Sequence, residues 1–298
     1  MPASQENLDA QSLDRYTQAA ISSSREVIRS YSTSFGLASN LLKQPIRTHV
    51  QNIYALVRVA DEIVDGAAAG ALGPNSRTET SSQLDKLEQE TYTAMKLGFS
   101  TNLVVHAFAD TANKTGITKK LVEPFFYSMR LDLLKTKHDQ KSFDLYVYGS
   151  AEVIGLMCLQ AFKQSKIFSI QEQETLRIGA QALGAAFQKV NFLRDLKADF
   201  EQLGRSYFPH VNVASFNEET KNRLVKEIKE DLALSAKTIP LLPSSSRKAV
   251  VAAQLLFDAL NRKIQKTPAT KLIKTRIRVT DIQKLFILLK AMIGVTPK

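Results

Sequence analysis

Apolar residues recur every three or four positions along most of this chain, which is the spacing of one face of an α-helix. The segment from Ile46 to Val64 is a clear case, with Val50, Ile53 and Val57 on one such face. No segment alternates apolar and polar residues for long enough to predict a β-strand. The 298 residues include only 12 Gly and 9 Pro, so few positions interrupt a helix. We therefore expect an all-α fold.

The sequence contains no internal repeat and no change of composition that would divide it into several folded units. Residues 1–20 are expected to form a loosely ordered N-terminal tail, and residues 21–298 one helical domain. A flexible break is expected at 66–75, which is rich in Gly and Ala. The longer, strongly apolar segments 144–162 and 171–200 predict central helices of a bundle.

The composition excludes several classes of protein. The chain is 44% apolar and 23% charged, which excludes a disordered chain. The single Cys158 excludes a disulfide framework and a Cys-based metal centre, and favours a reducing cytoplasm. The N-terminus lacks the basic start and apolar run of a signal peptide. The longest apolar stretch, residues 285–295, is too short to cross a bilayer.

The chain is strongly basic. Its 40 Lys and Arg residues exceed its 29 Asp and Glu residues by 11, which indicates an anionic partner. Nucleic acid, a membrane surface and a phosphorylated substrate all fit this charge. No RNA-reading motif or zinc-finger spacing supports the first of these. The basic stretch Lys263–Arg278 is consistent with a solvated helix face or with contact to anionic lipid.

Two segments carry acidic residues one helical turn apart. Asp61 and Asp65 form the first pair, and Asn191, Asp195 and Asp199 form a stripe in the second segment. Like charges at this spacing destabilise a helix unless a cation lies between them, so neutralising Asp195 is expected to leave folding unchanged or slightly favoured. Oxygen ligands suit Mg²⁺, which typically takes one or two carboxylates together with phosphate oxygens. Two such helices facing each other could hold a diphosphate through Mg²⁺.

Either acidic segment alone would also suit a solvated face supported by Arg–Asp pairs. The chain has two such segments, each beside an arginine and each within an apolar helix. This combination favours the binding site.

A series of motifs along the chain is more specific than the acidic segments alone. The motifs are Tyr31–Phe35, Tyr54–Arg58, Asp61–Asp65, Tyr146–Met157, Asn191–Asp195 and Gly204–Pro209. In this order they resemble the squalene/phytoene synthase family of head-to-head prenyl transferases, over about residues 31–285. The Asp-Glu-x-Val-Asp form of Asp61–Asp65 is most similar to bacterial phytoene synthases. The resemblance implies a single-domain isoprenoid-synthase helical bundle with a central active-site cavity, and a catalytic domain over residues 21–298.

The resemblance also implies a role for individual residues. The implied Mg²⁺ ligands are Asp61, Asp65, Asn191, Asp195 and Asp199, and the four aspartates count as catalytic together with Tyr54 and Tyr146 at the reaction centre. The implied substrate contacts are Ser32, Ser34, Arg58, Gln188, Asn191, Arg194, Arg205 and Tyr207. The candidates for the cavity floor are Leu156, Met157 and Phe187.

Structural roles remain open for several of these side chains. Tyr54 and Tyr146 would also fit as ordinary core tyrosines. Ser32 and Ser34 would also fit as caps of a following helix. Arg194 would also fit as the ion-pair partner of a neighbouring aspartate.

The implied reaction is the Mg²⁺-dependent condensation of two geranylgeranyl diphosphates to phytoene through a cyclopropyl (prephytoene) diphosphate, in carotenoid biosynthesis. Mn²⁺ is an alternative metal, and no nicotinamide cofactor is expected. The implied partners are allylic prenyl diphosphates and the inorganic diphosphate product, and no nucleic acid. Because the product is apolar, we expect a cytoplasmic protein with peripheral membrane contact. The sequence does not predict the oligomeric state.

Three alternatives remain open at this point. One is a basic nucleic-acid binder, which would bind DNA or RNA with a steep salt dependence. A dehydrosqualene or squalene synthase would use farnesyl diphosphate, and the squalene enzyme would add a nicotinamide reduction. A non-catalytic helical assembly protein would carry degenerate motifs, whereas the aspartates of both motifs are intact here.

Overall fold

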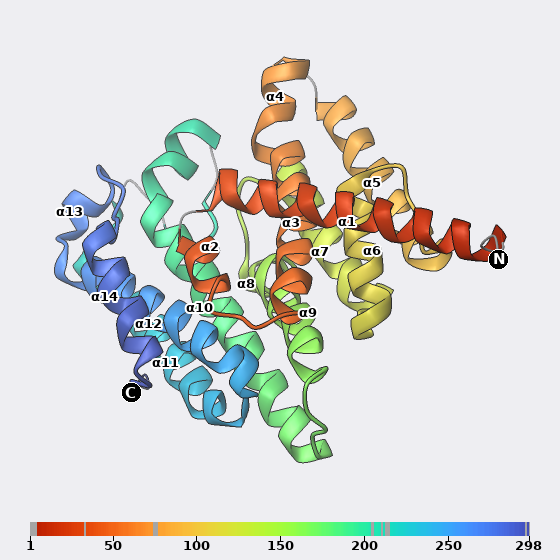
Figure 1. Cartoon of the computed structure of the whole chain (residues 1–298). Coiled ribbons are helices and arrows are strands. Elements are labelled where there is room, and N and C mark those ends of the chain that lie inside the picture. Colours follow the sequence, from red (N-terminus) through yellow and green to blue (C-terminus); the bar gives the residue numbers. More distant parts are fainter. Residues whose placement is uncertain are drawn as a thin grey trace.

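The protein is a bundle of helices (Figure 1). The computed structural model describes residues 5–32, 34–73, 77–203, 206–209, 211, 215–295 and 297. Within these residues the only β feature is an isolated bridge between Lys137 and Ser206. The expectation of an all-α fold is therefore confirmed.

Helices follow one another with short connections along the chain. The first half contains α1 (Gln5–Tyr31), α2 (Ser34–Ser39), α3 (Ile46–Asp65), α4 (Ala67–Leu72), α5 (Arg77–Leu97), α6 (Leu103–Thr115) and α7 (Lys119–Leu134). The second half contains α8 (Gln140–Val147), the π-helical turn η1 (Tyr148–Glu152), α9 (Val153–Lys163), α10 (Ile170–Leu203), α11 (Glu218–Thr238), the 3₁₀ turn η3 (Ile239–Leu241), α12 (Ser244–Lys266), α13 (Ala269–Leu272) and α14 (Asp281–Met292). The break expected at 66–75 thus contains the short helix α4.

The N-terminal segment differs from the expectation of a loose tail over residues 1–20. Helix α1 begins at Gln5 and runs along the molecule as one long helix (Figure 1). The hydroxyl of Thr17 lies 3.0 Å from Nε2 of His106, and the hydroxyl of Tyr16 donates to the carbonyl of Ser100. These contacts with distant residues fix the helix on the bundle. The sequence did not predict this ordered helix, because few side chains in the segment are apolar and could indicate a buried face.

The centre of the bundle depends on a close approach of η1 and α9 to α10. A Cβ at Gly155 would come within 2.6 Å of the carbonyl oxygen of Ala180, and one at Gly184 within 2.6 Å of the carbonyl oxygen of Ala151. Only glycine therefore fits at these two crossing points. By length and composition, residues 140–163 could also cross a membrane, but 56% of their apolar window is buried in the protein. This stretch is a core helix of the bundle.

Separate apolar clusters support the two helices that carry the acidic segments. Leu56 and Ala60 of α3 pack in a cluster with the fully buried Phe108 and Phe125. Leu193 of α10 belongs to a second cluster that includes α8, α11 and α12. Each helix is therefore anchored by its apolar face, and its polar face points away from these apolar clusters.

Candidate active site

A large cavity lies between the helices of the bundle. Its volume is about 1120 Å³, which exceeds the roughly 300–1,000 Å³ of ordinary small-molecule pockets. Helices α1, α2, α3, α9, α10, α12 and α14 all contribute side chains to its wall. Much of the wall is apolar, with Phe162, Leu183 and Leu256 among its residues. Arg58, Asp61 and Arg194 give it a charged end.

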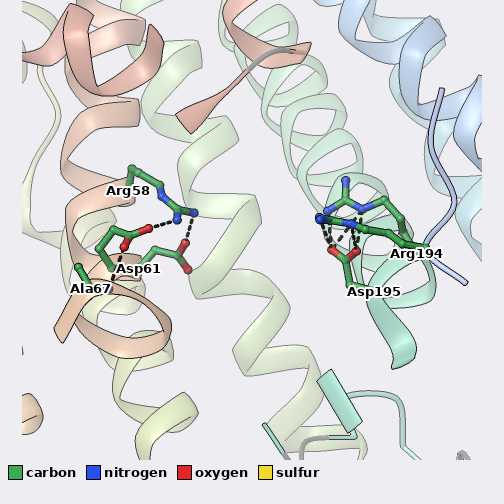
Figure 2. Close-up of polar contacts among 7 residues, drawn as sticks. Arg58, Asp61, Ala67, Arg194 and Asp195 are labelled. Atoms are coloured by element: carbon green, nitrogen blue, oxygen red, sulfur yellow. Dashed lines mark hydrogen bonds and ion pairs between the residues drawn. The ribbon is translucent and has the colours of Figure 1, made fainter. Parts of the chain in front are cut away.

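The first acidic segment lies on α3, beside this cavity. The guanidinium of Arg58 donates to the carboxylate of Asp61 across 2.5 Å and also pairs with Glu62 (Figure 2). The other oxygen of Glu62 accepts a hydrogen bond from the backbone of Ala67, so Glu62 fastens the start of α4. Asp65 is exposed at the end of α3. Arg58 and Asp61 are therefore the residues of this segment that reach the cavity.

The second acidic segment lies on α10. The guanidinium of Arg194 donates to Asp195 across 2.5 Å, and Arg276 pairs with the same carboxylate across 2.7 Å. Gln188, Asn191 and Arg194 line the cavity. Asp195 does not line it, but both of its arginine partners, Arg194 and Arg276, do. The side chains of Ser34 and Asp199, and all of Arg205, lie outside the described residues.

The two segments bring arginines to one space from two sides. In Figure 2, Arg58 and Arg194 extend toward each other from α3 and α10. Both line the same cavity. Arg276 and Arg278, from the segment before α14, line it as well. This concentration of guanidinium groups suits a ligand with several phosphate oxygens.

The oxygen donors present fit a divalent cation of the Mg²⁺ type. The Oδ1 atom of Asn191 is buried and accepts no hydrogen bond from the described residues. Asn191 lines the cavity, as Asp61 does. The described residues contain no group of three His, Cys, Asp or Glu side chains that could hold a metal ion by themselves. A bound cation would therefore need phosphate oxygens in addition to these protein oxygens, which is how Mg²⁺ commonly binds.

Ser32 and Tyr54 form the wall beside Arg58. The hydroxyl of Ser32 accepts hydrogen bonds from the backbone of Phe35 and Gly36, so it caps α2 while it lines the cavity. Burial raises the pKa of the Tyr54 phenol, and a hydrogen bond with Ser32 opposes this shift. The Tyr54 ring stacks on Phe35 with a centroid separation of 5.5 Å. Both polar side chains thus belong to a packed and aromatic part of the wall.

Tyr146 lies on the cavity wall with its hydroxyl turned to a buried carboxylate. It donates to Asp132 across 2.6 Å, and Tyr207 donates to the other oxygen of Asp132 across 3.0 Å. Burial and the neighbouring Asp132 carboxylate raise the pKa of Tyr146 well above its ordinary value. Tyr207 contributes no surface to the cavity and stacks on Phe192 instead. The structure therefore places Tyr207 on the side of Tyr146 that faces away from the cavity.

The sequence reasoning missed several residues of the site. Arg276, Lys284 and Asp132 are not in any of the motifs that the sequence displayed. The basic stretch 263–278 signals charge but does not show that Arg276 turns toward α10. Of the residues proposed for the cavity floor, Phe187 lines the cavity and stacks on Phe257 at 3.7 Å between centroids. Leu156 and Met157 are buried elsewhere.

Comparison with known families agrees with the motifs. The family model of squalene/phytoene synthase matches residues 28–283. Phytoene synthase 3 of Zea mays is 32% identical over 200 residues, which cover 66% of this chain and 44% of that protein. Phytoene synthase 1 of Solanum lycopersicum is 30% identical over 195 residues, which cover 63% of this chain and 44% of that protein. The matched region thus spans less than half the length of these two chloroplastic relatives.

Comparison with solved structures agrees on the fold. A dehydrosqualene synthase superposes with a TM-score of 0.75 at 19% identity, over 94% of this chain and 98% of that one. A squalene synthase from Alicyclobacillus acidocaldarius superposes with a TM-score of 0.70 at 19% identity, over 88% of this chain and 97% of that one. The expected isoprenoid-synthase type of helical fold is therefore confirmed.

Proposed function

Because the chain belongs to the squalene/phytoene synthase family, we propose that it is a prenyl transferase that joins two geranylgeranyl diphosphates head to head to form phytoene. The product would enter carotenoid biosynthesis. The reaction passes through a cyclopropyl (prephytoene) diphosphate and releases inorganic diphosphate twice. The preference for the longer substrate is supported by the phytoene synthases among the relatives.

One observation supports this function above the others. Arginine–carboxylate pairs on α3 and α10 border a single, largely apolar cavity of about 1120 Å³. Diphosphates bind the charged end, and the isoprenoid chains fill the apolar remainder. Apolar walls also exclude water, which would otherwise quench the allylic cation that forms when diphosphate departs.

The arginines act as the diphosphate clamp. When substrate enters, Arg58, Arg194 and Arg276 exchange their carboxylate partners for phosphate oxygens, which guanidinium forks also match. Asp61, Asp195 and Asn191 would then offer oxygen ligands to a divalent cation. Bound Mg²⁺ supplies positive charge that stabilises the departing diphosphate. Mn²⁺ would serve the same sites, and no nicotinamide is needed for this product.

The tyrosines act on the hydrocarbon part of the substrate. Tyr54 and Tyr146 line the cavity, and the electron-rich faces of their rings stabilise and steer positive charge there. The hydrogen bond to Asp132 holds Tyr146 at a fixed angle. Gln188 and Ser32 add polar contacts at the charged end. We place the protein in the cytoplasm with peripheral contact to a membrane that receives phytoene.

Product analysis with pure substrates tests this proposal. The protein with Mg²⁺ is incubated with geranylgeranyl or farnesyl diphosphate, with and without NADPH, and the hydrocarbons are identified by mass spectrometry. Phytoene from geranylgeranyl diphosphate alone is the expected result. Dehydrosqualene from farnesyl diphosphate, or squalene that requires NADPH, would replace the phytoene synthase proposal with a dehydrosqualene or squalene synthase. The similarity in fold to a dehydrosqualene synthase makes this the second candidate function. No product from either substrate would favour the non-catalytic assembly protein.

A further inference from the structure

Helix α14 carries a row of large apolar side chains on its outer face. Exposed fractions along this row, and in the residue after the helix, range from 46% to 78%. The row consists of Ile282, Leu285, Phe286, Leu289, Met292 and Ile293. Spacings of three and four residues place them on one side of the helix. We call this row the α14 apolar face.

The opposite side of α14 is fixed to the protein. Leu288 and Ala291 pack in an apolar cluster with α12, and Ala291 is 1% exposed. The first turn is closed by a capping box, in which Thr280 and Gln283 each accept a hydrogen bond from the backbone of the other. The helix is therefore a rigid part of the bundle. Its α14 apolar face is a preformed surface, without a partner among the described residues.

Positive charge surrounds this surface. Residues 270–295 contain six Lys and Arg residues and one Asp. Lys271, Lys274 and Lys290 are exposed. The amino group of Lys248 donates to the carbonyl of Met292, which brings a further positive charge from α12 to the end of α14. An anionic surface complements this charge, whereas a second copy of the chain would bring like charge against like.

The α14 apolar face also lies next to the cavity. Thr280, Asp281 and Lys284 from the start of α14 line the cavity wall. Tyr31 and Phe35 line it from the α1–α2 segment, and Tyr31 is 50% exposed. The helix therefore begins where the cavity meets the protein surface.

We propose that α14 is a membrane-docking helix that lies in the plane of an anionic bilayer, with its apolar face among the upper acyl chains. Its 12 residues extend about 18 Å, which is too short to cross a hydrocarbon core of about 30 Å. An amphipathic helix with basic residues beside its apolar side binds membranes in this way. The inference rests on the proposed function only for the consequence that an apolar product leaves the cavity into lipid.

Vesicle flotation of the full chain tests the proposal. The wild type is expected to float with vesicles that contain phosphatidylcholine and phosphatidylglycerol, and poorly with phosphatidylcholine alone. The double variant Leu285→Gln/Phe286→Gln is expected to lose at least about tenfold in partitioning, because two apolar side chains no longer enter the bilayer. Lys274→Gln/Lys290→Gln is expected to lose about fivefold per lysine on anionic vesicles only.

A matched control separates this face from exposed apolar residues in general. Leu8 and Leu97 are 50% and 68% exposed, and they belong to α1 and α5. The N-terminal end of α1 and helix α5 lie away from α14 in Figure 1. Leu8→Gln/Leu97→Gln should float like the wild type. Equal flotation of the α14 double variant and the wild type would overturn the proposal. A second result would also overturn it. If the wild type is a dimer that does not bind vesicles, and Leu285→Gln/Phe286→Gln converts it to a monomer, the α14 apolar face is an interface between copies of the chain.

Activity in detergent distinguishes failure of the membrane-docking proposal from failure of the proposed function. Leu285 and Phe286 do not line the cavity, so their double variant should keep wild-type turnover when detergent accepts the product. Loss of flotation with unchanged turnover supports the docking role. Unchanged flotation with normal turnover contradicts docking while the proposed function stands.

Discussion

The guanidinium of Arg276 lies 2.7 Å from the carboxylate of Asp195, although the two residues are 81 positions apart in the sequence. The contact joins the segment before α14 to the acidic stripe of α10. Arg194 holds the same carboxylate from within α10. The charged end of the cavity is therefore assembled from distant parts of the chain.

The pairing of Asp195 changes what its substitution is expected to do. Asp195→Asn should abolish turnover, because it removes a negative charge from the cation and diphosphate site without changing shape. Stability should fall by roughly 1 kcal/mol rather than rise, because Arg194 and Arg276 lose their shared partner. Circular dichroism with urea titration measures the second effect. Wild-type turnover in the folded variant would contradict the assignment.

Arg276 should contribute to binding of the diphosphate. Arg276→Gln is expected to lower kcat/KM by about 10–100-fold, the usual range for a lost charged hydrogen bond of about 1.5–3 kcal/mol. Arg262→Gln is the matched control, because Arg262 is exposed and pairs with Asp258 one turn away on the same helix. Steady-state kinetics on both variants checks this. Equal effects of the two substitutions would show that general charge, rather than the position of Arg276, is responsible.

The metal and the diphosphate should bind together. Because the described residues do not form a complete metal site, Mg²⁺ and inorganic diphosphate together should raise Tm more than the sum of their separate effects. Differential scanning fluorimetry with and without chelator measures this. Additive shifts would contradict a shared site. Asn191→Leu should remove the joint effect, because it deletes the unpartnered buried oxygen of that side chain.

The Asp132 carboxylate should position Tyr146. Tyr146→Phe and Asp132→Asn should each destabilise the protein by about 1–3 kcal/mol. Tyr146→Phe removes one of the hydroxyl donors to the buried Asp132 carboxylate, and Asp132→Asn removes the charge that strengthens its hydrogen bonds with Tyr146 and Tyr207. The double variant should be less unstable than the sum, and urea titration of the cycle gives the coupling. Additive effects would show that the hydrogen bond between Tyr146 and Asp132 does not contribute to stability.

Alkaline pH should weaken the protein through the same tyrosine. The pKa of Tyr146 is raised in the folded state, mainly by burial and by the Asp132 carboxylate. The folded state therefore keeps a proton that the unfolded state loses near the ordinary tyrosine pKa of about 10. This contribution to stability is complete below about pH 10 and declines as the pH rises above it. Unfolding free energies of the wild type and Tyr146→Phe across that range should converge, and parallel curves would contradict the prediction.

The sequence by itself determined the helical fold and the helices that carry the chemistry. Periodicity predicted Ile46–Val64 and residues 171–200 as helices, and they are α3 and most of α10. Helical periodicity is a local property, so it can be read without knowledge of the partner helices. The acidic spacing also showed that Asp61 and Asp195 belong to polar helix faces.

Only the tertiary structure decided which side chains meet. The fold brings Arg276 to Asp195, places Asp132 beneath Tyr146 and turns the outer row of α14 toward solvent. It also orders residues 5–20 as part of α1 through contacts such as Thr17 with His106. Each of these depends on the packing of helices that are distant in the sequence. A local pattern fixes the direction of a side chain on its own helix, but the side chain's neighbours depend on how all the helices pack together.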